Sequence, residues 1–351
     1  MKFIEIILII FLLSSCSEAE VKKDNINING EPLVVDEPVE EEVEKEIRYS
    51  VNVVDEGVYI YNTSKRGAYQ YGPSIMKNDD GSYDAWFSSP GNYSTQWDYI
   101  TYYHSDDGYD WYGEKVVLWP TSGSKDKCSV CDPGVIYFNG YYYLGYTSTN
   151  DVNGGGSNNS AFVARSEYPD GPFEKWNGES WGGDPEPIIE YTGDPKGWGV
   201  GELSFVVKDD DLYIYYTYFD LTGGSTRLMK ADLVDDWPST MRYKGIVCYK
   251  SLQDSLDIAY DVNLDTFIGV AIEMRMSDSS RIIVYESKDG KNFNSIETTK
   301  SNTYDYAHNI GMAKDKNGYI DTNEDIVIGY AFGKEWGRWS AIIQRLSIKT
   351  F

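Results

Sequence analysis

Two carboxylates stand in similar surroundings at distant positions of this sequence. Asp132 opens the run Asp-Pro-Gly-Val-Ile, and Glu202 opens the run Glu-Leu-Ser-Phe-Val. Hydrolysis of a glycosidic bond requires one carboxylic acid that protonates the leaving oxygen and a second carboxylate that activates water or attacks the sugar. The acid must keep its proton near neutral pH, and a neighbouring carboxylate helps by like-charge repulsion. The alternative is that Asp132 begins a strand-entry turn and that Glu202 is a solvated loop acid.

The pattern around these two residues occurs five times. Each copy has a residue of interest, an apolar run, a turn of Asp, Asn or Gly, and an aromatic-rich run; the copies begin at Gly72, Asp132, Glu202, Asp257 and His308. A repeat of roughly 50 to 70 residues built from hairpins is typical of a β-propeller. The innermost strands of a propeller surround one axis, so residues at one register meet there. We therefore predict an all-β fold, a five-bladed β-propeller with about 60 residues per blade.

Turn signals support this count. Asn139-Gly140 between two β-rich runs is a strong hairpin signal. Residues 105–111 and 287–293 share the pattern Ser-x-Asp-Gly-x-x-aromatic, and residues 166–173 hold a looser copy. Asp and Gly turn the chain, and the aromatic residue packs between neighbouring sheets. We expect these three segments to join the third and fourth strands of blades and to be structural.

Two of the repeats resemble a known family. Residues 131–143, Cys-Asp-Pro-Gly-Val-Ile-Tyr-Phe-Asn-Gly-Tyr-Tyr-Tyr, are similar to the second-blade motif of five-bladed glycoside hydrolases of the arabinanase/xylosidase type (family 43) and the invertase type (family 32). Gly201-Glu202-Leu203-Ser204 is similar to their third-blade motif, which carries the general acid. The resemblance implies that Glu202 donates the proton. It also implies that Asp132 orients this acid and tunes its pKa, or stabilises the transition state.

The first blade departs from the family pattern, because Gly72 stands where the family has an Asp that serves as base or nucleophile. On register, Asp257 is the favoured substitute, ahead of Asp98 and Asp261; alternatively Asp257 caps the start of a strand. His308 occupies the fifth register. In some relatives a His there sits near an ion on the axis, but it could also act as acid or base, or be a hydrogen-bonded structural residue.

Aromatic and cationic residues near these repeats are candidate sugar contacts. We expect Tyr71, Trp198, Arg275, Trp336 and Arg338 to bind substrate, with Arg338 able to pair with a uronic acid or sulfate group. The long loops at 150–160, 176–198 and 314–325 are further candidates for recognition. No cofactor is required; a structural cation on the propeller axis is possible. Residues 315–324 vaguely resemble a calcium loop but lack its ligand alternation, so an elongated hairpin is favoured over a metal site.

The N-terminal residues predict an exported lipoprotein. Residues 1–16 contain a short apolar run and then Leu-Ser-Ser-Cys, which resembles a bacterial lipobox with Cys16 as the lipidated residue. The alternative is an ordinary secretory signal. Residues 17–48 are acidic and poor in apolar side chains, which predicts a flexible tether before the propeller domain at 49–351. We expect an outer-membrane lipoprotein that faces the periplasm or the cell surface and meets the membrane only through its lipid.

Charge and cysteine content limit the remaining possibilities. The net charge of −25 opposes nucleic-acid binding, so the expected partner is an oligo- or polysaccharide. For Cys128, Cys131 and Cys248, buried thiols are favoured over a disulfide or a metal site. We expect an exo-acting glycoside hydrolase on a plant or algal type of polysaccharide or its oligosaccharides. The alternatives are a non-catalytic glycan-binding lipoprotein and a lyase that uses His308 and a Tyr.

Overall fold

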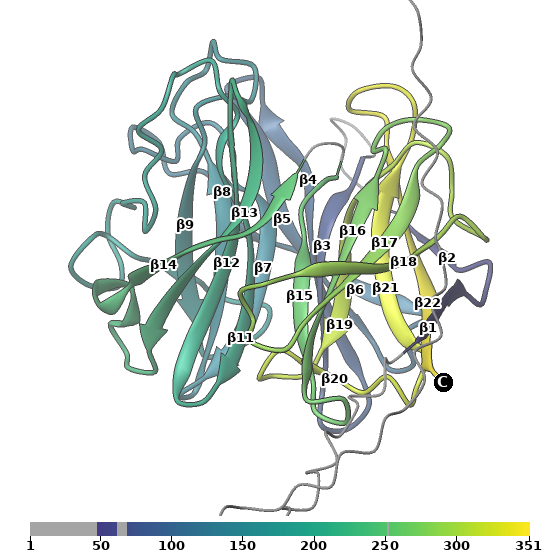
Figure 1. Cartoon of the computed structure of the whole chain (residues 1–351). Coiled ribbons are helices and arrows are strands. Elements are labelled where there is room, and N and C mark those ends of the chain that lie inside the picture. Colours follow the sequence, from purple (N-terminus) through teal and green to yellow (C-terminus); the bar gives the residue numbers. More distant parts are fainter. Residues whose placement is uncertain (1–47, 62–68, 251–252) are drawn as a thin grey trace, which may run out of the picture. The chain divides into compact units, whose positions relative to one another are not determined.

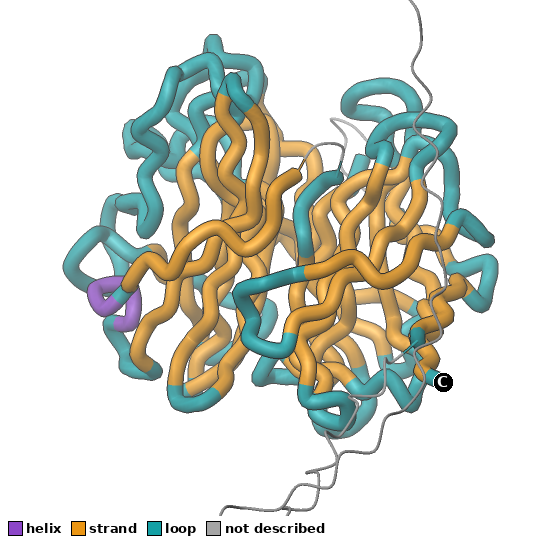
Figure 2. The backbone as a smooth tube through the Cα atoms, in the orientation of Figure 1, coloured by secondary structure: helices purple, strands orange, loops and turns teal. Residues whose placement is uncertain are grey.

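The computed structural model describes residues 48–61, 69–250 and 253–351, which belong to one compact unit, Ile47–Phe351. The signal peptide, Cys16 and nearly all of the proposed tether lie outside the described residues. Strands dominate this unit, and the 3-10 helix at Trp237–Thr240 is a single turn (Figure 2). No helix among the described residues has the length and apolar character that crossing a membrane would require.

Five antiparallel units of four strands form the blades, and their inner strands β3, β7, β11, β15 and β19 gather in the middle of the unit (Figure 1). The first three blades are β3 (Tyr71–Lys77), β4 (Tyr83–Tyr93), β5 (Gln96–Ser105), β6 (Trp111–Leu118); β7 (Cys131–Phe138), β8 (Tyr141–Ser148), β9 (Ser160–Ser166), β10 (Glu174–Lys175); and β11 (Gly199–Lys208), β12 (Asp211–Asp220), β13 (Gly223–Asp232), β14 (Arg242–Lys250). The fourth is β15 (Asp257–Asp261), β16 (Thr266–Glu273), β17 (Arg281–Ser287), β18 (Asn294–Thr299). The fifth is β19 (Ala307–Lys314), β21 (Ile326–Phe332), β22 (Ser340–Thr350) and β1 (Tyr49–Val53). The predicted five-bladed propeller is confirmed.

The two ends of the unit close the ring. β1 pairs antiparallel with β22, from Tyr49 opposite Thr350 to Val53 opposite Leu346, so a strand from the start of the unit completes the last blade. β2 (Val58–Ile60) also pairs with β22. β19 forms a short parallel pairing with β3 of the first blade. These pairings close the ring, so no free sheet edge is left between the first and last blades and the five blades are held around one axis.

The turns follow the residues that the sequence singled out. Asn139 and Gly140 have φ of 52° and 84° between β7 and β8, the left-handed conformation that a tight hairpin needs. Asp107 accepts hydrogen bonds from the backbone N–H groups of the next turn between β5 and β6, and Asp289 does the same between β17 and β18. The aromatic residue after the second turn, Phe293, packs edge-on against Tyr215 of the neighbouring blade. The structural role predicted for these turns is confirmed.

A bulge recurs near the start of four inner strands. The register shifts after Tyr71, Cys131, Gly201 and His308, as each strand pairs with the second strand of its blade. The residue that follows each shift has positive φ: Gly72 at 58°, Asp132 at 49°, Glu202 at 51° and Asn309 at 48°. Such a bulge re-aims the side chain at that position. Equivalent bulges therefore turn residues from different blades in the same direction.

Glycines let neighbouring inner strands approach closely two positions after the bulge. A Cβ on Gly134 would lie 1.9 Å from the Leu203 carbonyl oxygen of the next blade, and a Cβ on Gly311 would lie 2.0 Å from the Pro73 carbonyl oxygen. No side chain fits at such distances. These two positions therefore fix how tightly the inner strands surround the axis.

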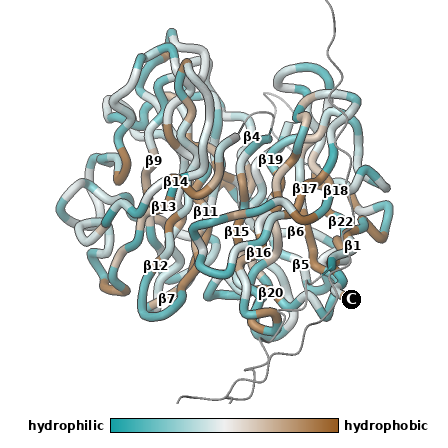
Figure 3. Tube along the Cα trace, viewed as in Figure 1, coloured by the Kyte–Doolittle hydropathy of each residue, from teal (hydrophilic) through white to brown (hydrophobic). Residues whose placement is uncertain are grey.

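The hydrophobic core lies between the blades. Apolar residues concentrate on the strands, and the connecting loops are more hydrophilic (Figure 3). One core cluster joins the second and third blades through Tyr143, Phe205 and Trp237, all fully buried. Each blade buries both faces of its sheet against its neighbours, which explains why the central strands read as nearly continuous apolar and aromatic runs.

The loop before β21 closes one end of the axis. Its carbonyl oxygens at Lys316, Asn317 and Gly318 accept hydrogen bonds from the backbone N–H groups of Tyr137, Val207 and Tyr260, on the second, third and fourth blades. β20 (Tyr319–Ile320) then pairs parallel with β15. This connection was a candidate recognition loop, but the structure uses it to tie inner strands together at the end opposite their bulges.

Candidate active site

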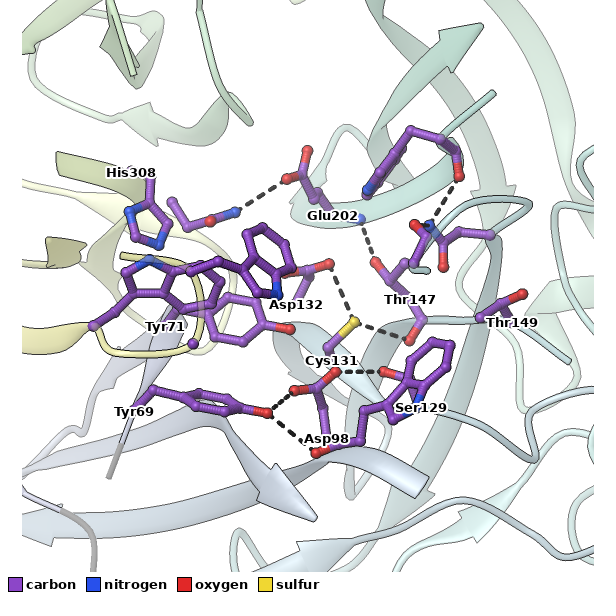
Figure 4. A pocket seen from close by; sticks show the side chains of 18 of the residues that line it. Tyr69, Tyr71, Asp98, Ser129, Cys131, Asp132, Thr147, Thr149, Glu202 and His308 are labelled. Atoms are coloured by element: carbon purple, nitrogen blue, oxygen red, sulfur yellow. Dashed lines mark hydrogen bonds between the residues drawn. The ribbon is translucent and has the colours of Figure 1, made fainter. Parts of the chain in front are cut away.

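A cavity of about 370 Å³ opens where the inner strands begin (Figure 4). Its walls combine aromatic rings with a few polar and charged groups. The lining residues are Tyr69, Tyr71, Trp97, Asp98, Ser129, Cys131, Asp132, Thr147, Thr149, Gly155, Gly156, Asn159, Trp198, Glu202, Arg275, His308, Asn309, Trp336, Gly337 and Trp339. A concave, largely aromatic site with few convergent polar groups is typical of a small-molecule pocket.

Asp132 and Glu202 both line this cavity, each from the bulged start of its inner strand. Burial raises the pKa of the Asp132 carboxyl well above its usual range, and the nearby charge of Glu202 raises it further. Hydrogen bonds from Thr147 and Cys131 act in the opposite direction. Two interacting carboxyls titrate as a pair, so this pair retains a proton to a higher pH than an isolated carboxyl does.

Side chains of the preceding blade hold the backbone at these two positions. The amide N of Asp132 donates to Ser88 Oγ over 2.7 Å, and the amide N of Glu202 donates to Thr147 Oγ1 over 2.9 Å. The two hydroxyls lie on β4 and β8, the second strand of the preceding blade in each case. The same arrangement at both positions places the two carboxyls equivalently, one blade apart.

Asn309 is a third residue at this register, and sequence reasoning missed it. Its Nδ2 donates to Glu202 Oε1 over 3.1 Å. Its own amide N donates to Asp254 Oδ2 over 2.7 Å, and Asp254 also lies 3.4 Å from Nε of Arg275. Asp254 raises the pKa of Arg275, although burial opposes the shift. Asn readily adopts the left-handed conformation. This preference was the one signal in the sequence that could have placed the bulge at Asn309 instead of His308.

His308 lines the cavity but does not occupy the shared register, so that expectation was wrong by one residue. The imidazole is buried, and its Nδ1 lies 3.4 Å from the carbonyl oxygen of Tyr306. A carbonyl partner places the proton on Nδ1. Among the described residues, Nε2 has no hydrogen-bonding partner. Burial lowers the pKa of His308 to about 4; the charge of Asp254 opposes this decrease and that of Arg275 adds to it. The ring is therefore neutral at pH 7 and presents Nε2 as an acceptor.

Asp257 lies elsewhere, and the expectation that it shares the register of Asp132 was wrong. A smaller cavity of about 30 Å³ lies on the axis, and residues 72–74, 132–134, 202–204 and 255–257 contribute to its lining. In this comparison Ser255 corresponds to the bulge residues Gly72, Asp132 and Glu202. Asp257 corresponds to Ser74 and Ser204. Ser74 and Ser204 accept hydrogen bonds from backbone N–H groups of the next blade. Asp257 does the same for Met312 N over 2.7 Å.

Asp257 also accepts a hydrogen bond from a lysine. Nζ of Lys314 donates to Asp257 Oδ1 over 2.6 Å and to Ser204 Oγ over 3.1 Å, with both charged side chains nearly buried. The ion pair therefore joins the inner strands of three blades. The fourth blade differs from the others because no bulge precedes β15, which shifts its acid two positions along the strand.

The expected sugar contacts divide into two groups. Tyr71, Trp198, Arg275 and Trp336 line the cavity. Trp336 is 77% exposed at the rim and packs edge-on against Trp339 at 4.7 Å. Arg338 does not line the cavity; its side chain is 79% exposed and pairs with Glu335 over 3.0 Å. The irregular loop at 333–339 brings Trp336 and Trp339, but not Arg338, to the cavity.

Asp98 is a further carboxylate on the cavity wall, and the sequence analysis ranked it too low. Asp98, on β5, accepts a hydrogen bond from Tyr69 OH on Oδ1 over 2.5 Å and one from Ser129 Oγ on Oδ2 over 2.8 Å. Tyr71 lies close by, since burial and then the charge of Asp98 raise its pKa well above the usual range. Asp98 lies outside the inner-strand repeat, so reasoning from the shared register ranked it behind Asp257.

The thiols and possible metal ligands complete the site. Cys128 and Cys131 are buried thiols, and Cys248 is half-buried. Burial, together with the charges of Asp132 and Asp98, raises the pKa of Cys131 well above its usual range, so this residue is a neutral thiol. Within the part of the chain that the structure describes, no group of three or more His, Cys, Asp or Glu residues is arranged to hold a metal ion.

Comparison with known proteins identifies the fold through structure alone. No protein-family model matches this sequence, and no curated protein matches it. Solved structures do match. A family 117 glycoside hydrolase of the marine bacterium Zobellia galactanivorans is 17% identical, with a TM-score of 0.59 over 86% of this chain and 90% of that chain.

Two further structures extend this result. An endo-arabinase from Bacteroides thetaiotaomicron is 18% identical, with a TM-score of 0.56 over 86% of this chain and 98% of that chain. An α-L-arabinofuranosidase from Podospora anserina, solved with cellotriose, is 11% identical, with a TM-score of 0.60 over 85% of this chain and 97% of that chain. The relatives in structure are thus propeller glycoside hydrolases, and the likeness at such identities establishes the fold.

Proposed function

We propose that this protein is a glycoside hydrolase that acts on a plant or algal type of polysaccharide or its oligosaccharides. One observation carries the proposal: the carboxyls of Asp132 and Glu202 line one aromatic cavity, and the charge of Glu202 raises the pKa of Asp132. Perturbed carboxyls that converge in a cleft are typical of general acid–base sites. The glycoside hydrolases that share the fold support the same reaction class.

In the proposed reaction Glu202 is the general acid. It gives its proton to the glycosidic oxygen as the bond to the anomeric carbon breaks, and Asp132 holds a proton within the pair until it is needed. Asn309 orients the Glu202 carboxyl through Oε1. The neutral His308 accepts a hydrogen bond from a sugar hydroxyl on Nε2, and aromatic faces at the rim stack on the sugar ring.

The shape of the cavity supports exo action. The loop around Lys316 closes the far end of the axis, and two rim loops contribute Gly155, Gly156 and Trp336 to the near end. A pocket closed at one end admits a chain terminus and excludes the middle of a polymer. We therefore expect the enzyme to release small products from chain ends.

Product analysis tests the proposal. Wild type and Glu202→Gln are incubated with arabinan, arabinoxylan, agar oligosaccharides and 4-nitrophenyl glycosides, and products are separated by anion-exchange chromatography. Wild type releases sugar from at least one substrate; Glu202→Gln loses roughly 10²- to 10⁴-fold in kcat, the range for loss of general acid catalysis, yet retains binding by calorimetry. A full rate with Glu202→Gln would reject the assignment. An ultraviolet-absorbing unsaturated product would instead indicate a lyase.

Gly72 favours one alternative, a glycan-binding protein on the same scaffold. A glycine occupies the bulge of the first blade, where its missing side chain would point toward Asp132 Oδ1, so this position supplies no carboxylate. Binding to one of these glycans by calorimetry without any cleavage would support the binder.

We further propose that the protein is a lipoprotein of the outer membrane, anchored by a lipid on Cys16. The support is the short apolar leader and the lipobox-like Leu-Ser-Ser-Cys before the acidic segment. A Cys16→Ser variant should no longer incorporate labelled palmitate and should leave the membrane fraction. Palmitate labelling that persists in Cys16→Ser would contradict the anchor.

A further inference from the structure

Glycoside hydrolysis needs a second carboxylate besides the acid, and two candidates for it are unsuitable. Gly72 has no side chain, and Asp257 is held by Lys314 on the axis, outside the main cavity. Among the described residues that line the cavity, the carboxylates are Asp98, Asp132 and Glu202. If Asp132 and Glu202 share the proton of the general acid, Asp98 is the remaining candidate for the second carboxylate.

We propose that Asp98 is the general base that activates the attacking water. The inference rests on the proposed hydrolase function and assigns the missing half of its chemistry. Asp98 lies on β5, the third strand of the first blade, and thus outside the five inner strands that carry the repeat. The first blade would then supply its carboxylate from a different strand of the same sheet.

The surroundings of Asp98 suit a base. Its two oxygens accept from Tyr69 OH and Ser129 Oγ, so hydroxyl donors on both sides fix the plane of the carboxylate. Trp97 precedes it and lines the same wall. The charge of Asp98 contributes to the raised pKa values of Tyr71, Cys131 and Asp132. Asp98 therefore lies near the reacting groups and not in a remote structural network.

The position of Asp98 relative to Glu202 suits a base and an acid that act from two sides of a sugar. Figure 4 shows the two residues on opposite sides of Cys131 and Asp132. A base that activates water stands ~6.5–9.5 Å from the general acid, whereas a carboxylate that attacks the sugar stands ~5–5.5 Å from it. A water molecule fits between a sugar and a base at the larger separation.

The step balances without a co-reactant. Asp98 accepts one proton from water while the water oxygen bonds to the anomeric carbon. The bond from that carbon to the leaving oxygen breaks with its electron pair, and Glu202 gives its proton to the leaving oxygen. One glycoside and one water yield two hydroxyl products, and exchange with solvent restores both carboxyls.

The first test is the stereochemistry of wild type, which requires no variant. Proton NMR of the first 4-nitrophenyl glycoside that wild type cleaves shows the anomeric configuration of the product before mutarotation. Inversion is expected. Retention would overturn the proposal, because a base that activates water cannot give it. Absence of cleavage across the whole panel would reject the proposed function itself, and this inference with it.

The second test uses variants of Asp98. Asp98→Asn keeps an oxygen acceptor but removes the charge, and kcat should fall roughly 10²- to 10⁴-fold, with little change in KM. Azide should accelerate Asp98→Ala and yield a glycosyl azide of inverted configuration, since a small anion can enter the vacated position. A purely structural role would not produce that product.

Controls separate chemistry from folding. Ser129→Ala and Tyr69→Phe each remove one donor to Asp98 and should reduce kcat far less than Asp98→Asn does. Thermal unfolding shows whether each variant folds. If Asp98→Asn folds and keeps a kcat within threefold of wild type, Asp98 is not the base, whereas the hydrolase function would still stand if Glu202→Gln is inactive.

Discussion

Asn309 on the fifth blade donates from Nδ2 to Oε1 of Glu202 on the third blade over 3.1 Å. The contact crosses the propeller axis and fixes one oxygen of the proposed acid. Removing Asn309 should therefore leave substrate binding intact and misorient the proton donor. We expect kcat to fall roughly tenfold or more with little change in KM, because a hydrogen bond to a charged group contributes about 1.5–3 kcal/mol.

Asn309→Gly is the matched variant for this measurement. Glycine adopts the φ of 48° at this position without strain, so the side chain is lost and the bulge is kept. Asn309→Ala should show the same loss of kcat with an additional loss of stability of about 1–2 kcal/mol, the cost of a left-handed Ala. Equal kcat for Asn309→Gly and wild type would show that this contact does not orient the acid.

Stability should depend on pH through Asp132. Burial raises its folded-state pKa well above the usual range, so the folded protein binds more protons than the unfolded chain between about pH 4 and the raised pKa. This contribution to stability is fully present below pH 4 and is lost as the pH rises through the folded pKa. Asp132→Asn cannot ionise and also tolerates positive φ.

The expected result is a melting-temperature difference between Asp132→Asn and wild type that becomes more favourable to the variant from pH 4 to pH 8. Each unit of raised pKa corresponds to about 1.4 kcal/mol, which calorimetry resolves. Activity should be lost at every pH. A difference that does not change with pH would contradict the raised pKa of Asp132.

The pair of Lys314 and Asp257 should matter for folding and not for chemistry. Both side chains are nearly buried, so Lys314→Met leaves an unpaired carboxylate among three blades and should cost about 3–5 kcal/mol of unfolding free energy. The double variant Lys314→Met/Asp257→Asn removes both charges and should recover part of that loss. Chemical denaturation measures each value.

Asp257→Asn by itself provides the kinetic test. It keeps an oxygen acceptor for Met312 N and should retain kcat within about threefold of wild type, since a loss of about 0.6 kcal/mol in barrier height is the limit expected of a remote change. A loss of a hundredfold or more in a folded Asp257→Asn protein would restore Asp257 as a catalytic candidate.

Trp336 should contribute binding and not catalysis. Its indole is 77% exposed and lies at the cavity rim, where a sugar could cover about 50 Å² of ring and gain about 1 kcal/mol. Trp336→Ala should then raise KM roughly fivefold at unchanged kcat. Tyr249→Ala is the control, because Tyr249 is equally exposed and does not line the cavity. Equal KM values for the two variants would exclude this contact.

Much of the fold could be read from the sequence because local signals agreed with one another. The Asn139-Gly140 hairpin, the Asp-Gly turns and the apolar runs each require only neighbouring residues, and all appear as predicted. The positions of Asp132 and Glu202 followed from the repeat, because equivalent bulges direct equivalent residues toward the cavity.

The errors in the candidate site arose where blades differ in backbone detail. His308 was placed one residue away from the bulge at Asn309, and Asp257 two positions away from Ser255, because the fourth blade has no bulge. A shift of one residue reverses the face of a strand. Arg338 was misplaced for a similar reason, since the conformation of its short loop is not encoded in a periodic pattern.

The amino-acid sequence by itself determined the five hairpin units, their order and the two acids of the second and third blades, because these depend on periodicity and turn chemistry within short segments. Only the tertiary structure decided which groups surround those acids. Asp98, Asn309 and Arg275 converge on the cavity from three different blades, and contacts across the axis depend on bulges and close strand approach that leave no short-range signal.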